Sequence, residues 1–336
     1  MATLPIWQDH YVTLGSSAYH DYELRLGAVS GPLIYTGRAY KRPGATDVVV
    51  RINDIVADYL REQLPQLAAA GFTSFALAAL VITRSGGATK DSNTFYNNWS
   101  YDPAFTTSMP LSDPVKKEVD PRQHVLYATL PAASVTATLY YKDGTTANIV
   151  IPIAGSADFN NDFNEDFSTI DGSKVGGCAV LDLSAYTGLD RVKIGKVTYK
   201  VVEKCPEWAV YYVNAYGGWD SLLVEGNVAR REAVARKTSK QDYDNNQVAA
   251  RGTRDYIAEI SPTWTLNTGV LSDDESSRMR HLLNSVEVYL CELGTGRMYP
   301  VVLTDTEHAL QTFKSNGRRV NEYTFTAQLA QERIRR

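Results

Sequence analysis

Residues 211–220 constrain the fold more than any other stretch of this sequence. Apolar and polar positions alternate toward the pair Gly217-Gly218, which forms a turn that few other residues adopt easily. The chain then continues through Trp219, a large aromatic side chain that needs packed surroundings. This pattern predicts a β-hairpin with an aromatic anchor. It is not a catalytic motif, and we find no convincing catalytic motif elsewhere.

Further turn signals predict a chain that is mainly β. Asp143-Gly144 lies between the alternating runs 136–141 and 146–151, which is a strong hairpin signal. Strand-like runs also occur at 22–26, 33–40, 48–52, 180–183 and 191–201. We therefore expect several short strands joined by turns in each part of the chain.

Helical spacing occurs at only two places. Ile55, Val56, Tyr59 and Leu60 recur at helical spacing before Pro65, with Asn53 or Asp54 as the cap. The second place is 272–285, where the sequence Ser-Asp-Asp-Glu forms a capping box ahead of an apolar helix face.

Three domains are expected. The first, 1–123, is β-rich and ends in an aromatic loop that contains several prolines. The second, 124–205, has the strand spacing of an immunoglobulin or fibronectin type III sandwich. The third, 206–336, is predicted to be a β-sandwich or barrel with one flanking helix and an extended polar arm at about 228–254.

Composition excludes several functional classes. A hydrophobic fraction of 44% is that of a globular protein, and the 21 Tyr against 9 Phe suit half-buried sheet faces and contact surfaces. The net charge of −4 does not predict a general or sequence-specific nucleic-acid binder. The N-terminus shows no signal peptide, and the longest apolar run, 72–82, is too short to span a membrane. Cys178, Cys205 and Cys291 are interpreted as reduced, buried thiols.

One acidic segment is a weak candidate for calcium binding. Oxygen ligands occur at alternate positions, at Asp158, Asn160, Asp162 and Asn164. However, Phe163 occupies the position where an EF-hand loop needs glycine, and Thr169 replaces the final glutamate. We therefore favour a solvated acidic loop, with no metal and no cofactor.

The surfaces proposed for subunit contacts are the arm and the aromatic loop. The segment 228–254 is interpreted as a long exposed loop or arm that binds an acidic surface of a neighbouring subunit. The candidate residues on it are Arg230, Arg231, Arg236, Lys237 and Lys240, and the candidates elsewhere are Trp99, Tyr101, Phe105 and Trp219.

Three blocks of this sequence resemble structural tail proteins of tailed bacteriophages that infect gut Bacteroidales. The first block is 34–44 with 50–60, and the second is 211–220. The third block consists of Trp264, the capped helix, 288–290, 299–301 and 323–325. The resemblance covers tail-tube, distal-tail and tail-adaptor types, and it transfers no catalytic residues.

The resemblance implies a virion protein that is made in the bacterial host cytoplasm and acts in the tail, tail tip or neck. It implies a ring of identical subunits, expected to be sixfold, that contacts other tail or neck proteins and through which DNA can pass. A carbohydrate-binding adhesin or receptor-binding module, with Trp99, Trp219 or Trp264 stacking on sugars, is the alternative. A polysaccharide hydrolase built on Asp158, Asp162 and Asp166 is the third reading.

Overall fold

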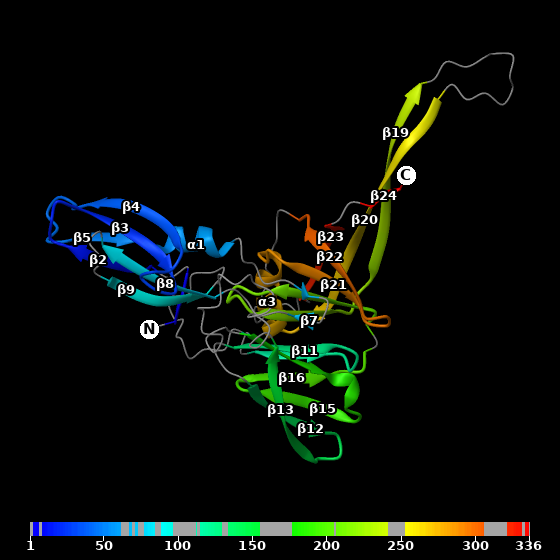
Figure 1. Ribbon diagram of the computed structural model, residues 1–336. Helices are drawn as coiled ribbons and strands as arrows, with labels where there is room; N and C mark the ends of the chain where they lie inside the picture. The colour runs from blue at the N-terminus through cyan, green and yellow to red at the C-terminus, as the bar shows by residue number, and fades with distance from the viewer. Residues whose placement is uncertain are drawn as a thin grey trace, which may run out of the picture. The chain divides into compact units, whose positions relative to one another are not determined.

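The computed structural model describes residues 3–6, 9–61, 67–68, 71–72, 77–84, 89–96, 112, 115–129, 134–154, 177–204, 206–240, 253–305, 321–330 and 333–335. These residues are mainly in β-strands and include two α-helices, which confirms the mainly-β prediction (Figure 1). The chain forms two compact units. The first contains 1–202, 212–221 and 284–286, and the second contains 203–211, 222–283 and 287–336. The sheets of the two expected N-terminal domains therefore lie in one compact unit.

A five-stranded sheet begins the first unit. Its order is β1 (Thr3–Pro5), β9 (Thr89–Tyr96), β8 (Leu77–Arg84), β3 (Tyr19–Leu26) and β4 (Leu33–Tyr40). Every second residue of β3 is buried, because one face of the sheet lies on the core. The short strands β6 (Leu67–Ala68) and β7 (Gly71–Phe72) form a separate pair.

The core under this sheet is shared with a two-stranded ribbon and a helix. The ribbon pairs β2 (Tyr11–Gly15) with β5 (Val48–Arg51), and α1 spans Asn53–Arg61, as predicted. Asn53 also joins the helix to the N-terminal segment. Its side-chain oxygen accepts from the His10 backbone N–H at 2.7 Å, and its amide nitrogen donates to the Ile6 carbonyl at 2.7 Å.

A seven-stranded sheet follows. Its order is β10 (Lys116–Val119), β16 (Val197–Val201), β15 (Leu189–Ile194), β12 (Ser134–Tyr141), β13 (Thr146–Ala154), β14 (Gly177–Asp182) and β11 (His124–Thr129). A single 3₁₀ turn, Leu183–Ala185, follows β14. All seven strands contribute buried side chains to one core, so the sheet curls into a nearly closed barrel. The Tyr199 hydroxyl of β16, the strand next to one end of the sheet, donates to the Leu126 carbonyl of β11, the strand at the other end, at 2.7 Å.

Two features of this sheet bear on the sequence predictions. The hairpin at Asp143-Gly144 is confirmed: β12 and β13 pair there, and Gly144 has a φ of 85°, which favours glycine. Strand β10 precedes the expected boundary after residue 123 but pairs in parallel with β16 of the barrel. Parallel pairing between segments about 80 positions apart leaves no local sequence signal.

The largest sheet has eight strands. The main order is β18 (Trp219–Val224), β17 (Trp208–Val213), β21 (Val288–Glu292), β22 (Arg297–Leu303), β23 (Asn321–Leu329), β20 (Thr253–Leu271) and β19 (Val228–Lys240). Strand β24 (Arg333–Arg335) also pairs with β20. This sheet and α3 (Asp273–Leu283) make up most of the second unit.

Two predictions made from local sequence patterns, the helix capping box and the glycine hairpin, are confirmed. The capping box forms, because the Glu275 N–H donates to the Ser272 hydroxyl at 3.3 Å and the Ser272 N–H donates to the Glu275 carboxylate at 3.2 Å. The β17–β18 hairpin turns at Gly217, whose φ is 88°. The Asn214 side chain holds this turn by accepting from the N–H groups of Tyr216 and Gly218.

Candidate functional site

The β19–β20 ribbon is the strongest candidate for a functional surface. The 13 residues of β19 pair with β20 in antiparallel register, from Val228 opposite Leu266 to Lys240 opposite Thr253. On its other side, β20 pairs with β23 from Thr263 onward and with β24 only at 258–260. Figure 1 shows the two strands extending beyond the rest of their sheet. The distal part of the ribbon is therefore a two-stranded projection.

The outer edge of β19 is open for pairing. In the part of the chain that the structure describes, β19 ends the strand order and pairs with β20 alone. An edge strand presents a row of backbone N–H and C=O groups that another chain can pair with. Natural proteins keep such edges short, covered or charged, and β19 carries six charged residues, so its length rather than its composition makes this edge a candidate for pairing with a partner.

From Arg230 to Thr238, the side chains on both faces of β19 are exposed, and no described residue covers them. Every residue from Arg230 to Thr238 is exposed, and Val234 in the middle is 48% exposed. Small or apolar residues at 233–235 separate two basic groups. The strand carries five basic residues and one acidic residue, a balance of +4, which leaves −8 on the remainder of a chain whose total is −4. The charge of the strand is therefore complementary to an acidic protein surface.

The base of the ribbon is fixed to the sheet. The guanidinium of Arg230 lies 5.6 Å from the ring centroid of Trp264 and donates to Glu232 at 2.7 Å. Trp264 is 1% exposed, and its ring lies 5.6 Å from that of Tyr299. These contacts hold the start of the ribbon in a defined direction.

The structure brings most of the predicted arm residues together. Arg230, Arg231, Arg236 and Lys237 all lie exposed on β19, and Lys240 is the last residue of that strand. The sequence was interpreted as an exposed loop or arm; residues 228–240 are a paired strand rather than a loop. An uncovered ribbon is polar on both faces, so its sequence lacks the alternation that identifies a strand.

The other predicted site residues have different outcomes. Trp219, predicted to lie at a subunit contact, is 1% exposed, so its ring packs inside the chain. Trp264, the other described tryptophan considered for sugar stacking, is also buried. Trp99, Tyr101 and Phe105 lie outside the described residues, as does the acidic segment 158–166 with its calcium candidates.

A buried ion pair holds the tip of the β17–β18 hairpin within the first unit. The Lys117 ammonium lies 2.8 Å from both carboxylate oxygens of Asp220, and the two side chains are 1% and 2% exposed. The Ser221 N–H donates to the same carboxylate at 2.8 Å, and the Tyr199 ring centroid lies 5.5 Å from the ammonium. Sequence reasoning missed this pair because its members are far apart along the chain.

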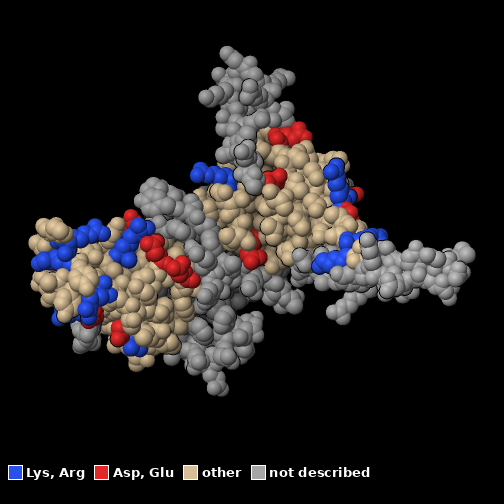
Figure 2. Space-filling model, turned by 90° about the horizontal axis from the view of Figure 1, so that it is seen from above, with Lys and Arg blue, Asp and Glu red and all other residues tan. Residues whose placement is uncertain are grey.

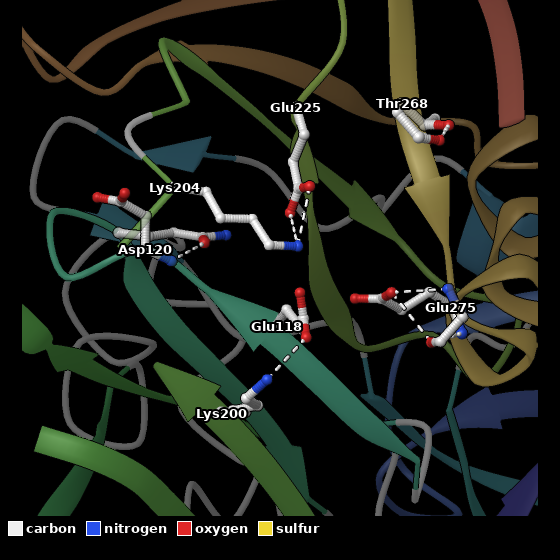
Figure 3. A network of polar contacts seen from close by, with 10 residues as sticks. Glu118, Asp120, Lys200, Lys204, Glu225, Thr268 and Glu275 are labelled. Atoms are coloured by element: carbon white, nitrogen blue, oxygen red, sulfur yellow. Dashed lines mark hydrogen bonds and ion pairs between the residues drawn. The ribbon is translucent and has the colours of Figure 1, made fainter. Parts of the chain in front are cut away.

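Other ion pairs lie nearer the surface. Figure 3 shows Lys200 donating to Glu118 at 3.3 Å and, separately, Lys204 donating to Glu225 at 2.9 Å. On the face seen in Figure 2, basic and acidic side chains of the described residues are interspersed. This face lacks the single-sign field that a general nucleic-acid binder uses.

A second surface that the sequence did not reveal lies on β3 and β4. Tyr19, Asp21, Arg38 and Tyr40 share the outer face of these two strands and form what we call the tyrosine–arginine face. The alternation within each strand placed these residues on a common face. Their pairing depends on the β3–β4 register, which the sequence alone did not define.

The described residues provide little for metal or thiol chemistry. Among them, no three His, Cys, Asp or Glu side chains gather where they could hold a metal ion. Cys178 and Cys291 are free and buried, and burial raises the pKa of the thiols to about 12 and about 11. Within the same residues, no helix has the length and apolar character needed to cross a bilayer.

Comparison with known proteins assigns neither a family nor a function to this chain. No protein-family model matches this chain, and no curated protein matches it significantly. The resemblance to phage tail proteins therefore stays a prediction, and function is inferred from the surfaces described above.

Proposed function

We propose that this protein is a structural subunit of a bacteriophage tail, tail tip or neck, and that it forms a ring by adding β19 to a neighbouring copy. The observation that carries the proposal is the long, exposed and basic edge of β19. Backbone pairing supplies the affinity in this mode of binding, and side chains on the two faces supply the specificity.

The charge distribution supports a copy of the same chain as the partner. The strand is basic and the remainder of the chain is acidic, so each subunit carries both halves of an attractive contact. The two halves are different surfaces, which makes the contact heterologous. Heterologous contacts produce closed rings when the rotation between neighbours closes. The expected sixfold symmetry and the contacts with other tail or neck proteins follow from the resemblance.

Sedimentation velocity over a range of protein concentrations tests the role of the ribbon. The full chain should form a discrete assembly. Val234→Lys places a charge at the centre of the pairing strand, where the side chain is half exposed, so it should weaken association about tenfold or more without unfolding the protein. Val150→Lys changes an equally apolar residue that is 69% exposed on β13, and it should behave like the full chain.

A shortened ribbon gives a second test. Arg236 lies directly opposite Ala258, so Asn-Gly can replace residues 237–257 as a two-residue hairpin turn. This variant keeps the contacts at the ribbon base and should remain a folded monomer. Unchanged assembly of the shortened chain would refute the role of the ribbon. Peptides of this chain in purified virions, detected by mass spectrometry, would test the viral assignment separately.

A further inference from the structure

The tyrosine–arginine face places two exposed aromatic rings side by side. Tyr19 and Tyr40 are directly opposite each other on β3 and β4, with ring centroids 6.1 Å apart and planes inclined by 45°. Their exposed fractions are 49% and 65%, although tyrosine normally buries much of its ring. Because both residues lie on paired strands whose opposite face rests on the core, their positions are held by the sheet.

A fixed ion pair lies beside the rings. Arg38 donates to Asp21 through Nε at 2.5 Å and through Nη2 at 3.1 Å, and its guanidinium carbon lies 4.8 Å from the Tyr19 centroid. The hydrogen bond from Arg38 lowers the pKa of the Asp21 carboxyl, so both groups stay charged at neutral pH. The guanidinium has five N–H groups; Asp21 accepts from two of them and the Tyr40 side chain also hydrogen-bonds to the guanidinium, and the remaining N–H groups can donate to a ligand.

The net charge of this face indicates the kind of ligand. Arg38 and Asp21 cancel, so the face favours neither a phosphate nor a cation. The next pair along the same face, Glu23 opposite Thr36, is polar, so the rings are not the centre of a larger apolar area. Protein–protein contacts are enriched in tyrosine and arginine but depleted in aspartate and glutamate, and Asp21 and Glu23 both lie on this face.

We propose that the tyrosine–arginine face binds a neutral saccharide. The C–H groups on one face of a pyranose ring carry partial positive charge and pack against the negative faces of the Tyr19 and Tyr40 rings. The sugar hydroxyls accept hydrogen bonds from Arg38 and donate to the carboxylate of Asp21. Binding at this face does not depend on ring formation by β19.

Native affinity electrophoresis tests the proposal with the full chain. The gels contain one soluble neutral polysaccharide each, namely mannan, galactomannan, xyloglucan or mixed-linkage β-glucan, and a parallel gel contains the anionic polymer alginate. At least one neutral polymer should slow the full chain. Tyr19→Ala and Tyr40→Ala should each bind it about tenfold more weakly, which corresponds to about 1.4 kcal/mol.

Two further variants distinguish this site from other causes. Tyr11→Ala removes a tyrosine that is 55% exposed on β2, outside the face, and it should bind like the full chain. Arg38→Lys keeps the charge but loses the two-point contact with Asp21, so it should bind more weakly. Circular dichroism should show the same fold for all four variants, because every changed side chain is exposed.

Several results would overturn the proposal. They are the absence of retardation by every neutral polymer, retardation by alginate alone, and equal loss of binding in Tyr11→Ala. If Tyr40→Ala weakened self-association while no neutral polymer bound the full chain, the face would be a protein contact. Ring assembly is measured separately with the ribbon variants, so the two proposals can fail independently.

Discussion

Breaking the buried pair between Lys117 and Asp220 should destabilise the first unit strongly. The pair joins β10 to the tip of the β17–β18 hairpin, and the two side chains are 1% and 2% exposed. Lys117→Met would leave the carboxylate with the Ser221 N–H among its known donors, and Asp220→Asn would leave a buried ammonium facing a neutral amide. Either change leaves one buried charge without the opposite charge of this ion pair.

The expected magnitude follows from burial. Removing one partner from a buried pair costs about 3–5 kcal/mol, because the remaining charge is uncompensated. An exposed pair contributes only about 0.2–1 kcal/mol. Arg230 and Glu232 form such a pair, with side chains that are 49% and 48% exposed, so Glu232→Gln is the matched control. The double variant Lys117→Met/Asp220→Asn strands no charge and should cost about 2–3 kcal/mol less than the sum of the single changes.

Urea unfolding of the four variants, followed by tryptophan fluorescence and far-ultraviolet circular dichroism, measures these free energies. Trp219 precedes Asp220 directly and is buried, so its emission should report on the same region. If Lys117→Met and Asp220→Asn each lowered the free energy of unfolding by less than about 1 kcal/mol, as Glu232→Gln should, the reasoning from burial would be refuted. Strict additivity in the double variant would show that the two charges are not energetically coupled.

Three further predictions concern local features. Burial raises the pKa of Cys178 to about 12 and of Cys291 to about 11, so iodoacetamide at pH 8 should label them only after denaturation, as measured by peptide mass spectrometry. Ser272→Ala should cost about 1 kcal/mol in urea unfolding through loss of the helix cap, and no change would contradict the cap's role. Burial raises the pKa of Glu287 above 4.5, so its contribution to stability is complete below pH 4.5 and is lost as pH rises through the native pKa. Glu287→Gln should flatten that dependence in unfolding measured at several pH values, and an unchanged slope would exclude Glu287 as its cause.

Features set by short-range chemistry could be predicted from the sequence. The Asp143-Gly144 turn, the Gly217-Gly218 hairpin and the capping box each depend on residues within a few positions of one another. The helix at 53–61 was also recognisable, because its apolar residues repeat with helical spacing.

Features set by long-range pairing could not be predicted. Strand β10 pairs with β16, and Lys117 meets Asp220 across 103 positions of the chain, so no local pattern marks either contact. The ribbon strand β19 was predicted only as an exposed loop or arm, because its described side chains from Arg230 to Thr238 are exposed on both faces and show no alternation. Trp219 was predicted to lie at a subunit contact, but its large ring, beside a tight turn, is buried in the core.

The most direct test of the central claim is native mass spectrometry of the purified full chain, supported by negative-stain electron microscopy. If the edge of β19 joins neighbouring copies, the spectrum should contain one closed multiple of the subunit mass, and the images should show rings. The chain with residues 237–257 replaced by Asn-Gly should then give the monomer mass. A full chain that stays monomeric at every concentration would contradict the account.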